Sequence, residues 1–204
     1  MNFKIKKKKK VLVTGGTGFI AGWIIKHLVE EGVTVHATVR DPDDKQKIAH
    51  LVKLSENNPG EIILFKADLL ERGSFNAAAK GCNIVFHTAS PFLFKFNDPV
   101  KDLINPAFEG TKNVLEAVNV TDSVERVVLT SSCAAIYGDA DECEYAPNNT
   151  LTEAIWNNTS SPSHQPYSYS KTIAEREAWK LADAQMRWSL AVSYTHLTLP
   201  TSLI

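Results

Sequence analysis

The chain has 204 residues, 44% of them hydrophobic, which is enough for one α/β domain with a buried core. Its formal net charge is −1, which excludes a global attraction to nucleic acid or to an anionic membrane. The three cysteines include no Cys-x-x-Cys pair, which argues against a disulfide framework or a zinc site and is typical of a reducing compartment. We therefore expect a cytoplasmic protein with no bound metal.

The first half of the chain alternates short apolar runs with helical patterns. Residues 1–10 form a lysine-rich lead-in that we expect to be solvated, and it carries no signal-peptide cleavage site. No apolar run approaches the length of a membrane span. The elements expected next, in chain order, are strand Val11–Val13, helix Ile20–Glu31, strand Val33–Val39, helix Asp43–Leu54, strand Glu61–Lys66, helix Ser74–Lys80 and strand Asn83–His87.

The second half contains the clearest helical pattern, in which apolar residues between 100 and 118 keep i, i+3, i+4 spacing. Asp98 and Pro99 precede it as a cap and a first-turn proline, and Pro106 inside it should cause a kink. The alternation of strands and helices predicts an α/β fold, a doubly wound parallel sheet of the Rossmann type over residues 11–191. The remaining expected elements are strand Arg126–Thr130, helix Tyr167–Ala184 and strand Trp188–Val192.

A glycine-rich turn follows the first expected strand directly, at residues 14–22. Such a turn brings backbone N–H groups against a pyrophosphate and starts a helix whose positive end faces that anion. Gly15 and Gly18 remove the side chains that would block this approach, and Phe19 and Ile20 begin the helix. We expect these four residues to contact a dinucleotide. Ala21 takes the place of the third glycine as a small helix-packing residue.

Arg40 closes the second expected strand, where the choice between NAD and NADP is made. An acidic residue here would bind the free 2′-hydroxyl of NAD, whereas a cation accommodates the 2′-phosphate of NADP. Lys47 could supply a second cation. Asp41 leaves two alternatives open, because its carboxylate could accept a hydrogen bond from a ribose hydroxyl or form an ion pair with Arg40. We expect NADP(H) as the cofactor.

Tyr167 and Lys171 are four residues apart and therefore share one face of the expected helix. A nearby ammonium favours the phenolate, so we expect Lys171 to lower the pKa of Tyr167. Ser132, after the fifth strand, could hydrogen-bond a substrate oxygen. Ser131 is adjacent, but strand geometry should point it to the opposite side. The carboxyl end of a strand is where open α/β sheets bind their ligands.

Seven segments together resemble the extended short-chain dehydrogenase/reductases, and within them the dihydroflavonol reductase and cinnamoyl-CoA reductase-like group of the NAD-dependent epimerase/dehydratase superfamily. These segments follow one another over residues 11–191, which makes the resemblance more specific than any single motif. They are TGGTGFIAG (14–22), VRDP (39–42), KADL (66–69), FHTASPF (86–92), NPAFEGTKNVLEA (105–117), VVLTSSCAAIYG (127–138) and YSYSKTIAEREAW (167–179).

The resemblance implies a role for each matching position. Ser132, Tyr167 and Lys171 would form the catalytic triad, and Lys171 would also bond the nicotinamide ribose. The residues implied around the rest of the cofactor are Arg40 and Lys47 at the 2′-phosphate, Asp68 and Leu69 beside the adenine, and Thr88, Ala89 and Ser90 near the ribose. Asp68 could instead only cap the following turn, and His87 is expected to be a packed strand residue. Phe92, Phe94 and Phe96 are expected to form an apolar loop.

The last residues depart from the family pattern. Residues 192–204 resemble a translated sequencing adapter, so we expect a non-native tail there. The chain would then stop before the C-terminal substrate-binding lobe, and we expect it to be poorly stable and to have little turnover.

The expected function is NADPH-dependent reduction of a small carbonyl compound, such as an aldehyde, a ketone or a dihydroflavonol-like molecule. Tyr167 would act as the general acid. Two alternatives stay open: a nucleotide-sugar epimerase/dehydratase or 3β-hydroxysteroid dehydrogenase-like enzyme, and a non-catalytic module that senses NADP. We expect no nucleic-acid or membrane partner.

Overall fold

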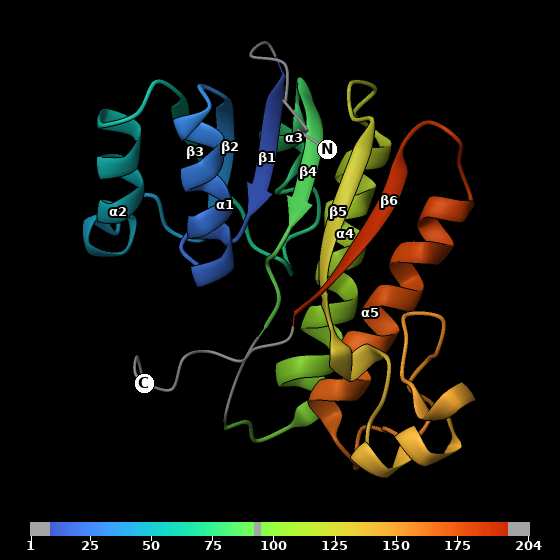
Figure 1. Ribbon diagram of the computed structural model, residues 1–204. Coiled ribbons are helices and arrows are strands. Elements are labelled where there is room, and N and C mark those ends of the chain that lie inside the picture. The colour runs from blue at the N-terminus through green and yellow to red at the C-terminus, as the bar shows by residue number, and fades with distance from the viewer. Residues whose placement is uncertain (1–8, 92–94, 196–204) are drawn as a thin grey trace.

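A computed structural model describes residues 9–91 and 95–195 (Figure 1). Three sets of residues with sequence-based expectations lie outside the described part: Lys6–Lys8 of the lysine run, Phe92 and Phe94 of the expected apolar loop, and residues 196–204. Among the residues that are described, no helix is both long enough and apolar enough to cross a membrane.

Six parallel strands form a single sheet in the order β3-β2-β1-β4-β5-β6. The order reverses direction between β1 and β4, which makes the carboxyl ends of these two strands the topological switch point of the fold. The prediction of a doubly wound Rossmann sheet is confirmed. The strands are β1 (Lys10–Thr14), β2 (Thr34–Val39), β3 (Glu61–Lys66), β4 (Cys82–His87), β5 (Arg126–Ser132) and β6 (Ser189–Thr195).

In the described part of the chain, five α-helices cover the two faces of this sheet (Figure 1). They are α1 (Phe19–Glu30), α2 (Lys45–Glu56), α3 (Asn76–Ala79), α4 (Asn105–Asn119) and α5 (Pro166–Asp183). On β1, Val11 and Val13 belong to the core beneath α1 and α2, whereas Leu12 belongs to the core shared with α3, α4 and α5. Successive side chains of a strand point to opposite faces, so one buried apolar strand supplies both cores.

The helix expected around residues 100–118 contains an irregularity in its first turn. Asp98 accepts hydrogen bonds from the N–H groups of Val100 and Lys101, as expected for a cap. The next five residues form a π-helical turn, η1 (Val100–Ile104), in which the N–H of Asn105 reaches back to the carbonyl of Val100. Pro106 stands at the start of α4 just beyond it. The widened turn accommodates a residue that has no N–H to donate.

Strand β6 continues beyond residue 191, where we expected the family pattern to end. Val192, Ser193, Tyr194 and Thr195 pair in parallel with Leu129, Thr130, Ser131 and Ser132 of β5. The first four residues of the expected tail are therefore part of the sheet. Whether residues 192–204 are non-native stays a prediction.

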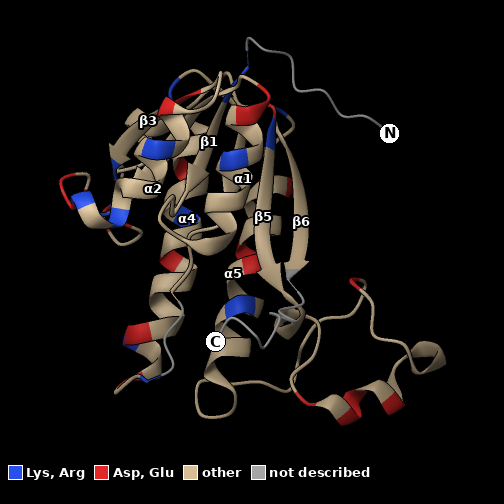
Figure 2. Ribbon diagram, turned by 60° about the vertical axis from the view of Figure 1, so that its left-hand side comes forward, with Lys and Arg blue, Asp and Glu red and all other residues tan. Residues whose placement is uncertain are grey.

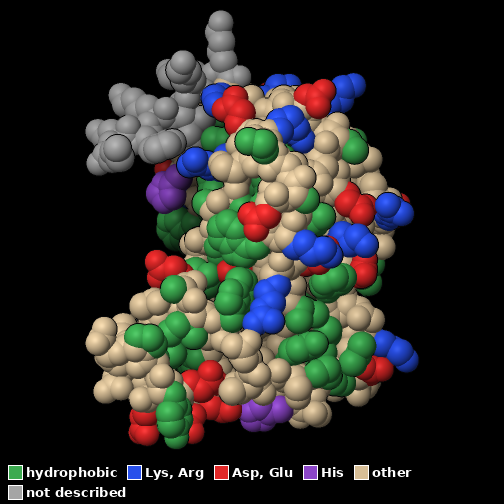
Figure 3. Space-filling view, turned by 90° about the vertical axis from the view of Figure 1, so that its right-hand side faces the viewer, with side chains coloured by type: hydrophobic (Ala, Val, Ile, Leu, Met, Phe, Trp, Pro, Cys, Tyr) green, Lys and Arg blue, Asp and Glu red, His purple; other side chains and the backbone are tan. Residues whose placement is uncertain are grey.

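A segment between β5 and α5 lies beyond the carboxyl edge of the sheet and was not anticipated as ordered structure. It contains three short 3₁₀ turns, η2 (Cys133–Ala135), η3 (Ala140–Tyr145) and η4 (Pro147–Asn149). The η3 turn carries Asp141, Glu142 and Glu144, which form the red group at the lower right of Figure 2. On the side of the molecule shown in Figure 3, charges of both signs are spread among hydrophobic side chains.

Gly60 marks the tightest backbone contact between α1 and the start of β3. A Cβ at this position would lie 2.5 Å from the carbonyl oxygen of Val33 and 2.6 Å from Cα of Val29. We expect Gly60→Ala to lower the free energy of unfolding by about 3 kcal/mol, because backbone must move to make room. Urea unfolding followed by circular dichroism measures this change.

Gly22, inside α1, provides the matched control, because a Cβ there meets no atom within 4 Å. We expect Gly22→Ala to stabilise the protein by about 0.5–1 kcal/mol through helix propensity. Equal stabilities of the two variants would show that the contact at Gly60 relaxes without cost.

Candidate active site

A cavity of about 510 Å³ opens at the carboxyl ends of β1, β2, β3 and β4. Most of the residues expected to bind a cofactor line it. The lining includes Gly15, Gly18, Arg40, Asp68, Leu69, Thr88, Ala89 and Ser90 from the sequence-based expectations, together with Thr17, Thr38, Val39, Ala67, Leu70, Phe75, Pro91, Asp102 and Pro106. The cavity lies at the switch point, where an open α/β sheet leaves room for a ligand.

The glycine turn passes too close to the neighbouring strand for larger residues. Gly15 has a φ of +71°, and a Cβ on it would lie 3.1 Å from Cα of Ala89. A Cβ on Gly18 would lie 3.1 Å from the carbonyl oxygen of Gly15. Thr38, at the end of β2, accepts from the Gly15 N–H through its hydroxyl and from the Gly16 N–H through its carbonyl. The turn is therefore a backbone-lined cradle that only glycine permits.

A buried hydroxyl joins the ends of β1 and β4. Thr14 Oγ1 accepts hydrogen bonds from the N–H groups of Thr88 and Ala89, at 3.2 and 3.1 Å. It also lies 2.9 Å from Nδ1 of His87. Because these two N–H groups use both lone pairs of the hydroxyl oxygen, its hydrogen points to His87, which therefore accepts at Nδ1. Burial and then the charge of Lys171 lower the pKa of His87 to about 3. This histidine is a packed strand residue, in agreement with expectation.

The start of α1 faces the cradle without a side-chain cap. Its N-cap residue is Gly18, and no acidic residue occupies the first turn of this helix. The N–H groups of Phe19 and Ile20 belong to that turn, and the Phe19 side chain is 66% exposed. An uncapped helix start attracts an anion through its backbone N–H groups and its dipole.

Arg40 lies on the cavity wall as an exposed cation, and within residues 9–91 and 95–195 it takes part in no ion pair. Asp41 accepts from the N–H of Asp43 instead of pairing with Arg40. Lys47 is not among the residues that line the cavity, and its ammonium is 2.9 Å from Asp44. The expected contact between Lys47 and a 2′-phosphate stays a prediction.

Asp68 and Leu69, which follow β3, form a further part of the cavity wall. The Asp68 carboxylate accepts from the N–H of Leu70, so it caps a turn and lines the cavity at once. Two residues of α4 contact Leu69. The Asn113 side chain donates to the Leu69 carbonyl, and a Cβ on Gly110 would lie 2.8 Å from the Leu69 side chain. Both roles considered for Asp68 are therefore compatible with its position.

The two neighbouring serines at the end of β5 point to different partners. Ser131 donates to the buried carboxylate of Glu175. Ser132 accepts from the N–H of Ala134, and its hydroxyl is hydrogen-bonded to Tyr167. The alternation expected from strand geometry thus brings Ser132, and not Ser131, to the tyrosine.

Lys171 is buried and reaches the carboxyl ends of two strands. Its Nζ donates to the carbonyl of Thr130 at 3.2 Å and to the Ser90 hydroxyl at 3.5 Å. Ser90 lines the cavity, so the lysine connects the cavity with the helix that bears Tyr167. Burial lowers the pKa of Lys171 to about 8, while the Glu175 carboxylate acts in the opposite direction.

The pKa of Tyr167 differs from the sequence-based expectation. Burial raises it above the ordinary value for tyrosine; the hydrogen bond from Ser132 acts to lower it, and Cys133 adds to the rise. The expectation of a Tyr167 pKa below its ordinary value is therefore wrong for this structure. The Lys171 ammonium donates to Thr130 and Ser90, and its effect on the tyrosine stays a prediction. The phenol is held in its protonated form.

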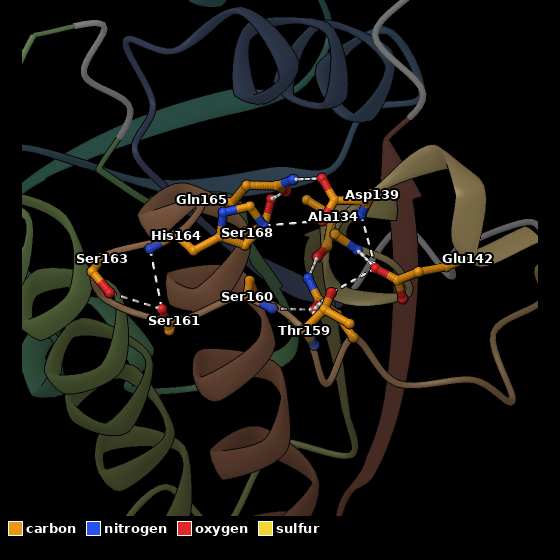
Figure 4. A network of polar contacts seen from close by, with 12 residues as sticks. Ala134, Asp139, Glu142, Thr159, Ser160, Ser161, Ser163, His164, Gln165 and Ser168 are labelled. Carbon is orange, nitrogen blue, oxygen red and sulfur yellow. Dashed lines mark hydrogen bonds and ion pairs between the residues drawn. The ribbon is translucent and has the colours of Figure 1, made fainter.

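Side chains between residues 139 and 165 form a network of polar contacts at the start of α5, close to Tyr167 in the sequence (Figure 4). Gln165 is the N-cap of α5, with a φ of +53°, and its side-chain amide donates to Asp139. His164 contacts the second oxygen of Asp139 at 2.9 Å. The Glu142 carboxylate accepts hydrogen bonds from the Thr159 hydroxyl and from the backbone N–H groups of Gly138 and Asp139. Polar contacts therefore fix the entry into the helix.

Sequence reasoning missed Thr38, Asp102 and Pro106 as cavity residues. Thr38 could have been found from its place two residues before Arg40, at the carboxyl end of a strand. Asp102 lies in the π-helical turn and Pro106 directly after it; the proline indicated an irregularity here, but not that these residues would line the cavity. Among the described residues, no cluster of His, Cys, Asp and Glu side chains could hold a metal ion.

A protein-family model described as the NAD dependent epimerase/dehydratase family matches residues 11–200. Among curated relatives, a cinnamoyl-CoA reductase CAD2 of Medicago truncatula is 45% identical over 172 residues, which are 83% of this chain and 52% of that protein. Tetraketide alpha-pyrone reductase 1 of Arabidopsis thaliana is 44% identical over 178 residues, which are 86% of this chain and 53% of that protein. The chain spans about half the length of these relatives.

Solved structures show the same likeness. Gre2 of Candida albicans in complex with NADPH superposes with a TM-score of 0.76 at 34% identity, over 90% of this chain and 56% of that one. A yeast methylglyoxal/isovaleraldehyde reductase Gre2 complexed with NADPH gives a TM-score of 0.77 at 30% identity, over 91% and 57%. The resemblance to the reductase group is confirmed by these relatives.

Proposed function

This chain belongs to the NAD dependent epimerase/dehydratase family, and from that premise we propose that it is the cofactor-binding and catalytic part of an NADPH-dependent reductase of a small carbonyl compound. One observation carries the proposal. Ser132, Tyr167 and Lys171 meet at the carboxyl edge of the sheet, and Lys171 contacts a residue of the cavity that Arg40 also lines.

The residues around the cavity fit NADP(H). Glycines at 15 and 18 leave a cradle that a Cβ would fill, and the uncapped start of α1 supplies N–H groups for a pyrophosphate. Arg40 offers an exposed cation to a 2′-phosphate, and Asp68 with Leu69 forms a wall for the adenine. When bound, the cofactor supplies the hydride that the carbonyl carbon accepts.

The chain's own residues supply the proton and the orientation. The Ser132 hydroxyl is placed to donate a hydrogen bond to the substrate oxygen, and Tyr167 gives that oxygen the proton which completes the alcohol. A tyrosine held in its protonated form suits the direction of reduction, because the acid must carry its proton before the step. The Lys171 ammonium, one helical turn from Tyr167, would stabilise the phenolate that is left after the proton transfer.

Two further observations bear on the alternatives. The relatives named above are reductases, which favours reduction over epimerisation or steroid oxidation. The hydrogen bond between Ser132 and Tyr167 favours a catalyst over a sensor module, because cofactor binding alone does not need it.

Titration of the chain with NADPH and NADH, followed by tryptophan fluorescence and calorimetry, tests the first part of this function. We expect saturable binding, at least about tenfold tighter for NADPH because a charge-assisted contact to the 2′-phosphate is worth that much. Absence of binding to either nucleotide at about 1 mM, the upper end of usual affinities for cofactors and substrates, would overturn the proposal.

A further inference from the structure

Glu175 is a buried carboxylate in the interior of the molecule, one helical turn after Lys171. Glu175 is only 1% exposed and lies on the face of α5 that packs against β5 and β6. A charge at such depth is costly unless its surroundings compensate it. No part of the proposed reaction uses this group, so its retention needs a separate physical explanation.

Three donors surround the carboxylate. Ser131 of β5 donates to Oε2, while Trp179 of α5 and Tyr194 of β6 donate to Oε1 at 3.3 and 2.7 Å. All three are electrically neutral. They satisfy the oxygens and stabilise the ionised form, but they add no positive charge.

The positive charge that compensates Glu175 belongs to Lys171. These residues are spaced i, i+4 on α5, and the carboxylate raises the pKa of the lysine against the larger effect of burial. The Lys171 ammonium donates to Thr130 and Ser90, which are both neutral. Glu175 is the one charged group among the described residues that shifts this pKa; no group on α4 or η1 does.

Several other titratable groups lie around the pair. His87 on β4 is neutral, since burial lowers its pKa to about 3. Burial raises the pKa of Tyr167, and burial together with Glu175 and Glu153 raises the pKa of Tyr194. Cys133 of η2 acts on Tyr167 and not on the lysine. Glu153 acts on Tyr194, and among the described residues Glu175 is the charged group that acts on Lys171.

We propose that Glu175 is a positioning residue of the active site, whose buried carboxylate keeps Lys171 in the ammonium form at neutral pH. The consequence for catalysis rests on the proposed function, whereas the electrostatic coupling does not. With Glu175 present, about nine in ten Lys171 side chains carry a charge at pH 7. Loss of the carboxylate should leave about half or fewer charged.

A titration of Lys171 in the full chain measures this coupling directly. Lysine is labelled with ¹³C, the Lys171 resonance is assigned with Lys171→Arg, and its chemical shift is followed by NMR from pH 6 to 11. We expect Glu175→Gln to lower the apparent pKa of Lys171 by at least about one unit. Glu177→Gln, two residues away and paired with Lys180 in the native chain, should leave that pKa unchanged.

Equal pKa values of Lys171 in Glu175→Gln and Glu177→Gln would overturn the proposal. Should Glu175→Gln fail to fold, Glu175→Asp retains the charge on a shorter stem. In Glu175→Asp we expect the pKa of Lys171 to lie below its value in the native chain. A pKa at or above the native value would contradict the proposal.

The pH dependence of NADPH binding separates this inference from the proposed function. If both hold, NADPH affinity falls above about pH 8 in the native chain and above about pH 7 in Glu175→Gln, because the charged lysine is lost at those values. A shifted lysine titration without any NADPH binding would support the role of Glu175 and contradict the function proposed for the site.

Discussion

Replacing Tyr167 by phenylalanine is expected to lower carbonyl reduction about 100- to 10,000-fold, the range usual for loss of a general acid. The substitution removes one oxygen, which is the proton donor and the partner of Ser132. The ring remains and keeps its partly buried position, so the fold and the cradle should persist. NADPH affinity is therefore expected to change by less than about twofold. Initial rates of NADPH oxidation with aldehyde and ketone substrates give the first quantity, and fluorescence titration gives the second.

Tyr169 offers the matched control, because it lies on the same helix two residues further on and points away from the face shared by Tyr167 and Lys171. Tyr169→Phe should leave both turnover and cofactor affinity unchanged. The rate is measured on the longest form of the protein that can be expressed, since this chain spans about half the length of its relatives. Turnover that survives in Tyr167→Phe at the native level would rule out the tyrosine as the acid.

Removing the guanidinium of Arg40 is expected to weaken NADPH binding about 10- to 100-fold and to leave NADH binding within about twofold. The two cofactors differ only in the 2′-phosphate, and charge-assisted hydrogen bonds to a phosphate account for a difference of this size. Arg40 lies on the cavity wall and is exposed, so Arg40→Ala leaves the core untouched. Calorimetric titration with each nucleotide measures the two affinities at one salt concentration, because screening alters the contribution of an exposed charge.

Two lysines of α2 serve as comparisons for Arg40. Lys53→Ala removes an exposed cation from the last turn of α2 and should not change either affinity. Lys47→Ala decides the prediction left open by the structure: a loss of NADPH affinity would show that Lys47 exchanges its contact with Asp44 for the phosphate. Equal weakening of NADPH and NADH in Arg40→Ala would mean that the arginine supports the cavity wall and does not select the cofactor.

Strong local signals made most of the fold predictable. Strands such as β1 and β3 are short apolar runs bounded by turn residues, and β3 has the bounds that the sequence predicts. The glycine turn was recognisable because one phosphate-binding geometry requires small residues at a fixed place after a strand. Ser132 could be preferred over Ser131 because side chains of a strand alternate between two faces.

Contacts between distant segments could not be predicted in the same way. The hydrogen bond between Gln165 and Asp139 depends on a segment whose sequence has no helical or strand periodicity. The 3₁₀ turn η3 in this segment is stabilised by side-chain hydrogen bonds and not by helix propensity. The π-helical turn before Pro106 arises from the proline, but its width follows from packing. The pKa of Tyr167 is raised first by burial, which spacing along a helix does not determine.

The hydroxyl of Thr14 places a limit on sequence variation that hydrophobicity alone would not reveal. Thr14 is fully buried at the end of an apolar strand, where valine would fill the same volume. Valine would leave two backbone N–H groups and one imidazole nitrogen without their partner, and each such buried group costs about 1–3 kcal/mol. A redesign of this domain guided by core packing would introduce valine there and separate the two halves of the sheet at their junction. A hydroxyl-bearing residue is the requirement at this position, and shape is secondary.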